Sequence, residues 1–171
     1  MRGHLSRNQG LYLVALGSNM RHPRHGLPRK VLRIALAAME DAGIAVLAAS
    51  PAIESLPLGP SLRRYANAAA LVRTGMDPPA LLAALQRIER AFGRKHRGMR
   101  WRARVLDLDI VLWSGGAWRS DRLTIPHPEF RNRAFVLTPA NAVAPGWRDP
   151  ATGRTIAQLS ARLTRRRPAP R

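Results

Sequence analysis

Apolar residues recur with two different periods along the first two thirds of the chain. Segments 11–16, 44–53, 65–73 and 105–113 are short, mostly apolar and bounded by turn residues, which is typical of buried strands. Segments 27–42 and 78–92 carry apolar residues at near-helical spacing, and a glycine follows each of them. The order strand, helix, strand, strand, helix, strand predicts an α+β sandwich with an antiparallel sheet of four to six strands.

Two shorter helices are expected nearer the C-terminus, over 131–140 and 155–163, after a turn at Gly115 and Gly116. The chain has 171 residues, which suggests one domain. We expect a flexible N-terminus over 1–10, a single domain over 11–163 and a basic tail rich in proline and arginine over 164–171.

Charge is the least ordinary part of the composition. The chain has 29 Lys+Arg against 10 Asp+Glu, a formal net charge of +19, and only Lys30 and Lys95 among the basic residues are lysines. A nucleic acid or another polyanion would explain this excess, and so would an arginine-biased composition on solvated surfaces. Cysteine is absent, which excludes disulfides, thiolate zinc sites, iron–sulfur clusters and cysteine nucleophiles. The apolar run at 11–16 is too short for a signal peptide or a membrane span, so a cytoplasmic protein is expected.

Two aspartates follow the most basic stretch of the chain. Strand alternation in 105–112 predicts that Asp107 and Asp109 share one face of the strand. The opposite face points to the core and carries Leu106, Leu108, Ile110 and Leu112. Two like charges so close together need arginine partners or a divalent metal. One interpretation is a salt-bridge cluster, and the other is a site for Mg²⁺ and a nucleotide, because arginines and metal-binding carboxylates together suit a polyphosphate. Neither GxxxxGK[ST] nor GxGxxG occurs, which excludes P-loop and Rossmann sites.

Nine short motifs then occur in a familiar order. They are Leu16-Gly17-Ser18-Asn19, Pro57-Leu58-Gly59-Pro60, Tyr65-x-Asn67-Ala68, Gln86-x-x-Glu89, Gly93-Arg94, Arg100-Trp101, Arg104-x-x-Asp107-x-Asp109, Pro126-His127-Pro128 and Arg133-x-Phe135-Val136-Leu137-x-Pro139. Over about residues 11–160 the chain resembles the 6-hydroxymethyl-7,8-dihydropterin pyrophosphokinases of folate biosynthesis. The resemblance implies a ferredoxin-like sandwich and the transfer of pyrophosphate from ATP to the hydroxymethyl group of a pterin, with release of AMP.

The resemblance also implies roles for individual residues. Asp107 and Asp109 would bind two Mg²⁺ ions and, with Arg94 and Arg104, form the catalytic group. The nucleotide would be contacted by Gln86, Glu89, Arg100, Trp101, Ile110, Arg122, Thr124, His127 and Arg133. The pterin would be contacted by Ser55, Pro57, Leu58, Tyr65, Asn67 and Phe135, with the two aromatic rings stacked on it.

The chain departs from the family pattern in its nucleotide-closing loop. Arg102-Ala103 stands where the family has Gly-Pro, His96 takes a position often held by arginine, and the loop after Pro60 is shortened. These departures are consistent with a divergent enzyme that uses a related pterin, as in a methanopterin-type pathway, or with one of lower activity. The alternatives are a basic ferredoxin-like module that binds nucleic acid and a paralogue that binds pterin or nucleotide without catalysis. On the leading interpretation the partners are ATP and a pterin, with no specific nucleic acid and no membrane, and the protein is a monomer.

Overall fold

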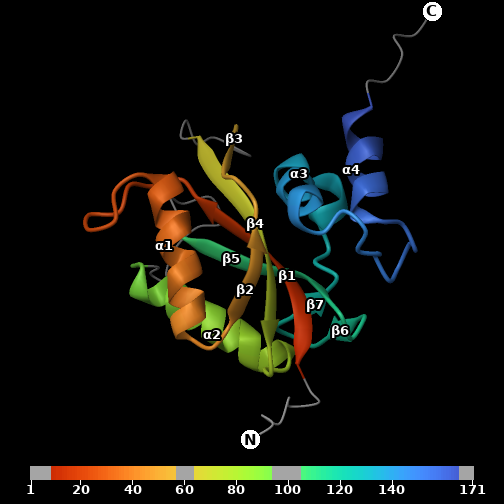
Figure 1. Ribbon diagram of the computed structural model, residues 1–171, viewed down its shortest axis with the longest axis horizontal. Coiled ribbons are helices and arrows are strands. Elements are labelled where there is room, and N and C mark those ends of the chain that lie inside the picture. The colour runs from red at the N-terminus through yellow and green to blue at the C-terminus, as the bar shows by residue number, and fades with distance from the viewer. Residues whose placement is uncertain (1–8, 57–63, 94–104, 166–171) are drawn as a thin grey trace, which may run out of the picture.

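The computed structural model describes residues 9–56, 64–93 and 105–165 and contains a five-stranded antiparallel sheet (Figure 1). Its strands are β1 (Gly10–Ser18), β2 (Ala45–Ala49), β3 (Ile53–Ser55), β4 (Tyr65–Thr74) and β5 (Asp107–Trp113). The order across the sheet is β2-β4-β1-β5, and β3 pairs with β4 beyond the end of β2. The predicted α+β architecture is therefore confirmed.

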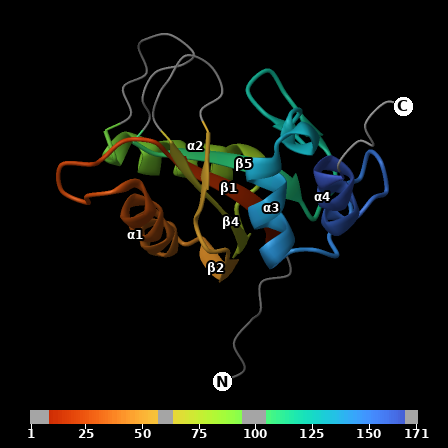
Figure 2. The same cartoon turned by 90° about the horizontal axis from the view of Figure 1, so that it is seen from above.

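Helices cover the two faces of the sheet unequally. Helices α1 (Pro28–Asp41) and α2 (Pro78–Ala91) pack on one face with the larger apolar core, which includes Leu16, Leu85 and Leu108. The other face receives the 3₁₀ helix η1 (Phe130–Asn132) and the helices α3 (Ala134–Val143) and α4 (Ile156–Thr164), around a smaller core that contains Leu13 and Phe130. Figure 2 shows these two groups of helices on opposite sides of the strands. Of the described residues, none belongs to a helix that could cross a bilayer.

Capping residues explain where two of the helices begin. The Asp77 side chain accepts a hydrogen bond of 2.9 Å from the Ala80 amide at the start of α2, where prolines cost no hydrogen bond. Thr155 and Gln158 form a reciprocal capping box at the start of α4. Both helix starts were predictable, because these local contacts depend on neighbouring residues.

A β-bulge changes the alternation of β5. Leu13 pairs with Leu112 and Val14 with Ile110, so Val111 is an additional residue in β5. Leu112 consequently lies in the smaller core with Val111, whereas Leu106, Leu108 and Ile110 lie in the larger one. The prediction that Leu112 shares a face with them was wrong because strand alternation does not continue through a bulge.

Two predicted elements are divided in the structure, and one hairpin was not predicted. The segment 44–53 is divided into β2 and β3 at Ser50-Pro51, where the Ser50 hydroxyl accepts a hydrogen bond from the Ala69 amide. The predicted helix 131–140 is divided by the extended backbone of Arg133 into η1 and α3. A small hairpin of β6 (Trp118–Arg119) and β7 (Thr124–Ile125) was not predicted, because strands of two residues carry no periodic pattern.

Candidate active site

Polar side chains lie at one end of the sheet face that η1, α3 and α4 cover. In the sheet register Gly17 of β1 lies between Asn67 of β4 and Asp107 of β5. Ala15 lies in the next row and is paired with Asp109. Residues paired across antiparallel strands share a face, so Asn67, Asp107 and Asp109 belong to one surface. From the spacing of strands, the Cα atoms of Asn67 and Asp107 are about 10 Å apart, with only a glycine between them.

Asn67 is oriented by a neighbouring strand. Its side-chain nitrogen donates a hydrogen bond of 2.7 Å to the Ser55 hydroxyl, and the residue is 5% exposed. Ser55 is paired with Tyr65, so three residues predicted to contact a pterin lie on adjoining positions of β3 and β4. A methyl group on Gly17 would lie 3.6 Å from the Asn67 side-chain oxygen, which places that oxygen beside the glycine. The Asn67 amide and the Ser55 hydroxyl could exchange hydrogen bonds with the polar edge of a flat ligand. Gly17 has no side chain, so such a ligand could approach the backbone of β1 closely.

His127 lies beside the acidic residues of β5. Its amide donates to the Val111 carbonyl oxygen at 3.0 Å, and its Nδ1 accepts from the Glu129 amide at 3.2 Å. Burial and the Arg133 charge lower the pKa of His127, against the opposing influence of Glu129 and Asp107. Because Nδ1 accepts a hydrogen bond, the neutral ring carries its proton on Nε2, which can donate to a phosphate oxygen.

The lowered pKa of His127 can be measured directly. We expect NMR titration of the free protein to give a pKa below 6.5 for His127. Arg133→Ala should move that pKa upward, because a repelling positive charge is removed. A midpoint at or above 6.5 in the unsubstituted protein would contradict the environment described for this ring.

Arg133 and Phe135 come from the beginning of α3. Arg133 is the residue that precedes the helix, and its guanidinium carbon lies 5.8 Å from the centroid of the Phe135 ring. Phe135 is half-buried and packs against the smaller core. Since α3 contacts β1, β3 and β4, the predicted phosphate-binding arginine and pterin-stacking ring are anchored on the same face as Asn67.

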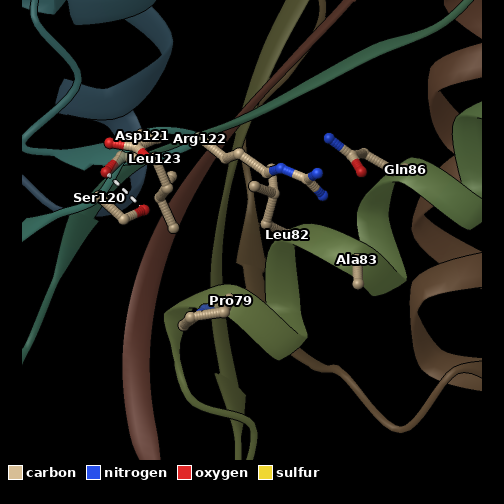
Figure 3. A pocket seen from close by; sticks show the side chains of 8 residues that line it. All are labelled: Pro79, Leu82, Ala83, Gln86, Ser120, Asp121, Arg122 and Leu123. Atoms are coloured by element: carbon tan, nitrogen blue, oxygen red, sulfur yellow. Dashed lines mark hydrogen bonds between the residues drawn. The ribbon is translucent and has the colours of Figure 1, made fainter.

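A second group of predicted residues lies at a pocket between α2 and the turn of the small hairpin (Figure 3). It is lined by Pro79, Leu82, Ala83, Gln86, Ser120, Asp121, Arg122 and Leu123. Figure 3 shows the Arg122 side chain extending from the hairpin turn toward Gln86 of α2. An apolar wall from α2 with polar groups at its rim suits a nucleoside.

Only Gln86 and Arg122 of this pocket were predicted to contact a nucleotide. Pro79, Leu82 and Ala83 could have been added, since positions three and four apart share a helix face with Gln86. The hairpin residues Ser120, Asp121 and Leu123 follow no periodic pattern that would have identified them. Thr124 begins β7 next to the pocket, whereas the Ile110 side chain is buried in the larger core.

Glu89 is almost completely buried, with 1% of its surface exposed. Its Oε1 accepts a hydrogen bond of 2.8 Å from the Leu108 amide, which lies between Asp107 and Asp109 in β5. The carboxylate therefore ties α2 to the part of β5 that carries both aspartates. Its predicted contact with a nucleoside stays a prediction.

Loss of this buried acceptor should weaken the fold. Glu89→Ala leaves the Leu108 amide unsatisfied and is expected to lower the free energy of unfolding by at least about 1–3 kcal/mol in urea titrations. Glu89→Gln, which keeps an acceptor oxygen, should lose less. Glu40→Ala is the matched control, because Glu40 accepts from the Val46 amide at 2.7 Å in an exposed position where water can replace it. Equal losses of unfolding free energy in Glu89→Ala and Glu40→Ala would show that burial of the acceptor does not determine its contribution.

The segment from Arg122 to His127 connects the pocket beside α2 with the polar residues on the opposite face of the sheet. Arg122 lies at the pocket on the α2 side, and Ile125 is buried in the core beneath α1 and α2. His127 then binds the backbone of β5 on the side of Asp107, and Phe130 enters the smaller core. Because β5 is the edge strand, this segment passes around the edge of the sheet. A ligand that occupies both the pocket and the polar residues near Asp107 would therefore also pass around the edge of β5.

Several predicted residues lie outside the described part of the chain. These are Arg94, Arg100, Trp101 and Arg104 of the basic stretch and Pro57 and Leu58 of the proline-rich loop. Their contacts with phosphates and pterin stay predictions. Within the described residues, the structure brings Ser55, Tyr65 and Asn67 together, and separately groups Asp107 with His127 and Arg133.

Comparisons with known proteins bear on these predictions. Residues 13–145 match the family model for 7,8-dihydro-6-hydroxymethylpterin-pyrophosphokinase. A 2-amino-4-hydroxy-6-hydroxymethyldihydropteridine pyrophosphokinase of Synechocystis is 39% identical over 147 residues, covering 86% of this chain and 73% of that protein. The protein of the same name from Pseudomonas aeruginosa is 41% identical over 150 residues, covering 86% and 88% of the two chains.

The fold has counterparts among solved structures. A crystal structure of wild-type Plasmodium falciparum HPPK-DHPS with STZ-DHP superposes with a TM-score of 0.70 at 13% identity. The match covers 90% of this chain and 43% of that one, so this chain spans less than half of the Plasmodium protein. At this identity the likeness concerns the fold alone.

Proposed function

The chain belongs to the 7,8-dihydro-6-hydroxymethylpterin-pyrophosphokinase family, and from this we propose that it transfers pyrophosphate from ATP to the hydroxymethyl oxygen of 6-hydroxymethyl-7,8-dihydropterin in folate biosynthesis. The structural observation that supports this proposal is the register of Asn67, Gly17 and Asp107, in which a side-chain amide and one of the two aspartates lie on either side of a glycine. In the reaction, a bond forms between the hydroxymethyl oxygen and the β-phosphorus of ATP. The bond from that phosphorus to the oxygen bridging it to the α-phosphate breaks, and AMP leaves.

The acidic pair fits Mg²⁺. Asp107 and Asp109 are both half-exposed on the edge strand, and within the described residues no group of three or more histidine or acidic side chains could hold a metal. Magnesium commonly takes one or two carboxylates and completes its shell with water and substrate phosphates. We propose that Asp107 and Asp109 hold two such ions, whose charge would stabilise the phosphoryl oxygens of the transition state.

The protein's own residues bind and orient the two substrates. Asn67 and Ser55 supply hydrogen bonds to the pterin edge, and Phe135 and Tyr65 flank its ring. His127 and Arg133 neutralise phosphate charge, and Asp109 takes the hydroxyl proton. The nucleoside occupies the pocket at Gln86 and Arg122, so the triphosphate crosses the edge of β5 to reach the acidic pair.

A product assay tests this function. The purified protein, Mg²⁺ and ATP are incubated with several hydroxymethylpterins, including one of the methanopterin type, and products are identified by mass spectrometry. We expect AMP and a pterin diphosphate in equal amounts. Formation of ADP instead, or no turnover with any pterin, would contradict the proposal. Binding of the ligands without any turnover would favour the non-catalytic paralogue.

The excess of positive charge leaves nucleic-acid binding as a second candidate. A dedicated binding module would hold oligonucleotides tightly at physiological salt, whereas non-specific attraction weakens steeply as salt rises. We propose a monomer without a specific nucleic-acid partner. Oligonucleotide titrations at several salt concentrations distinguish the two, since tight binding without ATP turnover would favour the module.

The C-terminal arginines should contribute little to catalysis. Replacing Arg165, Arg166 and Arg167 with serine is expected to leave ATP turnover nearly unchanged, because the described site is built from residues 15–135 and the tail charge is screened by salt. Steady-state rates at physiological salt provide the measurement. A collapse of activity would show that the tail belongs to the site.

A further inference from the structure

A buried ion pair joins the segment that carries His127 and Arg133 to the chain that precedes α4. The Asp149 side chain is completely buried and accepts two hydrogen bonds of 2.7 Å from Nε and Nη2 of Arg131. It accepts two more, from the Thr152 hydroxyl at 2.6 Å and from the Ala151 amide at 3.1 Å. Both carboxylate oxygens are therefore satisfied by protein donors, and the guanidinium is fixed in its plane.

The loop that supplies the carboxylate is itself well fixed. The Asp149 amide donates to the Arg154 carbonyl oxygen at 2.9 Å, and the Gly153 amide donates to the Asp149 carbonyl oxygen at 2.8 Å. The Ile156 amide donates to the Trp147 carbonyl oxygen at 2.9 Å, which ties the loop to the start of α4. These hydrogen bonds fix the position of Asp149 and, through it, that of the Arg131 guanidinium.

Arg131 lies in the middle of η1, between the two predicted phosphate-binding residues. The Phe130 amide donates to the His127 carbonyl oxygen at 3.2 Å, and the Arg133 amide donates to the Phe130 carbonyl oxygen at 3.3 Å. These bonds are longer than the usual 2.9–3.0 Å, and a helix of three residues does not hold its own position. Its anchors are the buried Phe130 ring and the Arg131 guanidinium, which lies 4.7 Å from the centroid of that ring.

Stability alone does not account for a buried ion pair. Replacing a buried pair with packed apolar residues is often neutral or stabilising, because the charges lose hydration, and here Asp149 loses all of it while Arg131 stays 27% exposed. Burial alone would raise the pKa of Asp149, but the hydrogen bonds from Arg131 and Thr152 lower it below its ordinary value, so the carboxylate is ionised at neutral pH. The pair fixes the orientation of the Arg131 side chain and thereby the position of η1.

We infer that the pair of Arg131 and Asp149 is a positioning device for the ATP phosphates, which fixes η1 and thereby holds His127 and Arg133 in place relative to Asp107. The inference rests on the proposed function, because it assigns His127 and Arg133 to phosphates. Arg131 and Asp149 are positioning residues, since they act through their neighbours. Asn67 and Ser55 lie on β4 and β3, outside the segment that the pair fixes, whereas Phe135 follows Arg133 in α3. The effect should therefore fall mainly on ATP and to a smaller extent on the pterin.

The test uses two conservative variants of the full chain. Asp149→Asn keeps the shape and removes the charge, and Arg131→Lys keeps the charge and removes the bidentate fork. We expect each to raise KM for ATP at least about tenfold, because small displacements of positioning groups have large effects, while KM for the pterin rises by much less. Assays are run well below the melting temperature of the weaker variant, which is measured separately.

The same loop offers a matched control. Arg148 donates from Nη1 to the Gly153 carbonyl oxygen at 2.8 Å and is exposed, so Arg148→Lys disturbs the loop without touching η1. Its KM for ATP should equal that of the unsubstituted protein. An unchanged KM for ATP in a folded Asp149→Asn or Arg131→Lys protein, or an equal rise in both KM values, would overturn the inference.

Three further outcomes are separable. If Asp149→Asn does not fold, Arg131→Lys alone decides. If the unsubstituted protein forms no AMP, the proposed function fails. If it turns over and the folded variants keep their KM for ATP, only the positioning role fails.

Discussion

Asp107→Ala and Asp109→Ala should each lower kcat at least about 10³-fold while the protein stays folded. Each substitution removes a carboxylate from the half-exposed pair on β5 and, with it, charge that would hold Mg²⁺ against the phosphates. Because the two aspartates repel each other, loss of one should not by itself destabilise the strand. Single-turnover assays with Mg²⁺ and ATP measure the chemical step, and circular dichroism with thermal melting measures the fold.

A distant aspartate serves as the control for this prediction. Asp41 is exposed at the end of α1, and Asp41→Ala should change neither turnover nor melting temperature beyond the scatter of the assay. If both Asp107→Ala and Asp109→Ala proteins unfold, the pair is a structural salt-bridge cluster. If both fold and turn over normally, the catalytic assignment is wrong.

Gly17→Val should weaken pterin binding while leaving ATP binding intact. Valine is favoured in strands, and a first carbon at this position would be 3.6 Å from the Asn67 oxygen, an ordinary contact that the fold can accept. The branched side chain would then occupy the space above β1 between Asn67 and Asp107. Overpacking of this kind costs about 1–3 kcal/mol, so KM for the pterin should rise by roughly 5- to 150-fold.

Comparison with other glycine substitutions makes this test specific. Gly17→Ala should give a smaller rise in KM for the pterin, since it adds a single carbon. Gly75→Val places the same side chain where no atom lies within 4 Å of the added carbon, and it should leave both KM values unchanged. A Gly17→Val protein with normal KM for the pterin would show that the pterin does not lie over β1.

Local patterns predicted the fold wherever they were uninterrupted. The alternation in β5 was right from Leu106 to Ile110 and failed at Leu112, because the bulge at Val111 arises from pairing with Leu13 and Val14 nearly one hundred residues earlier. The capping contacts of Asp77 and Thr155 lie within one turn and were accordingly visible in the sequence.

The candidate site was predictable only as a set of residue types. Motif resemblance selected Asn67, Asp107 and His127, but the open glycine between the first two follows from strand register. The burial of Glu89 against the Leu108 amide was also invisible, since a glutamate on a helix is usually solvated. The pair of Arg131 and Asp149 joins an arginine and an aspartate eighteen residues apart that no helical or strand period relates.

The passage of the chain around β5 has a second consequence, which concerns self-association. An edge strand with unpaired amides and carbonyl groups can add a strand from another molecule. The segment from Arg122 to His127 covers this edge, and the His127 amide takes up the Val111 carbonyl. At the opposite edge β2 has only five residues, and the register shift between Val46 and Ala48 leaves Leu47 as an extra residue that interrupts any regular ladder. Within the described residues, neither edge of the sheet therefore offers a long regular template for strand addition, and we expect the segment from Arg122 to His127 to disfavour pairing between molecules at β5.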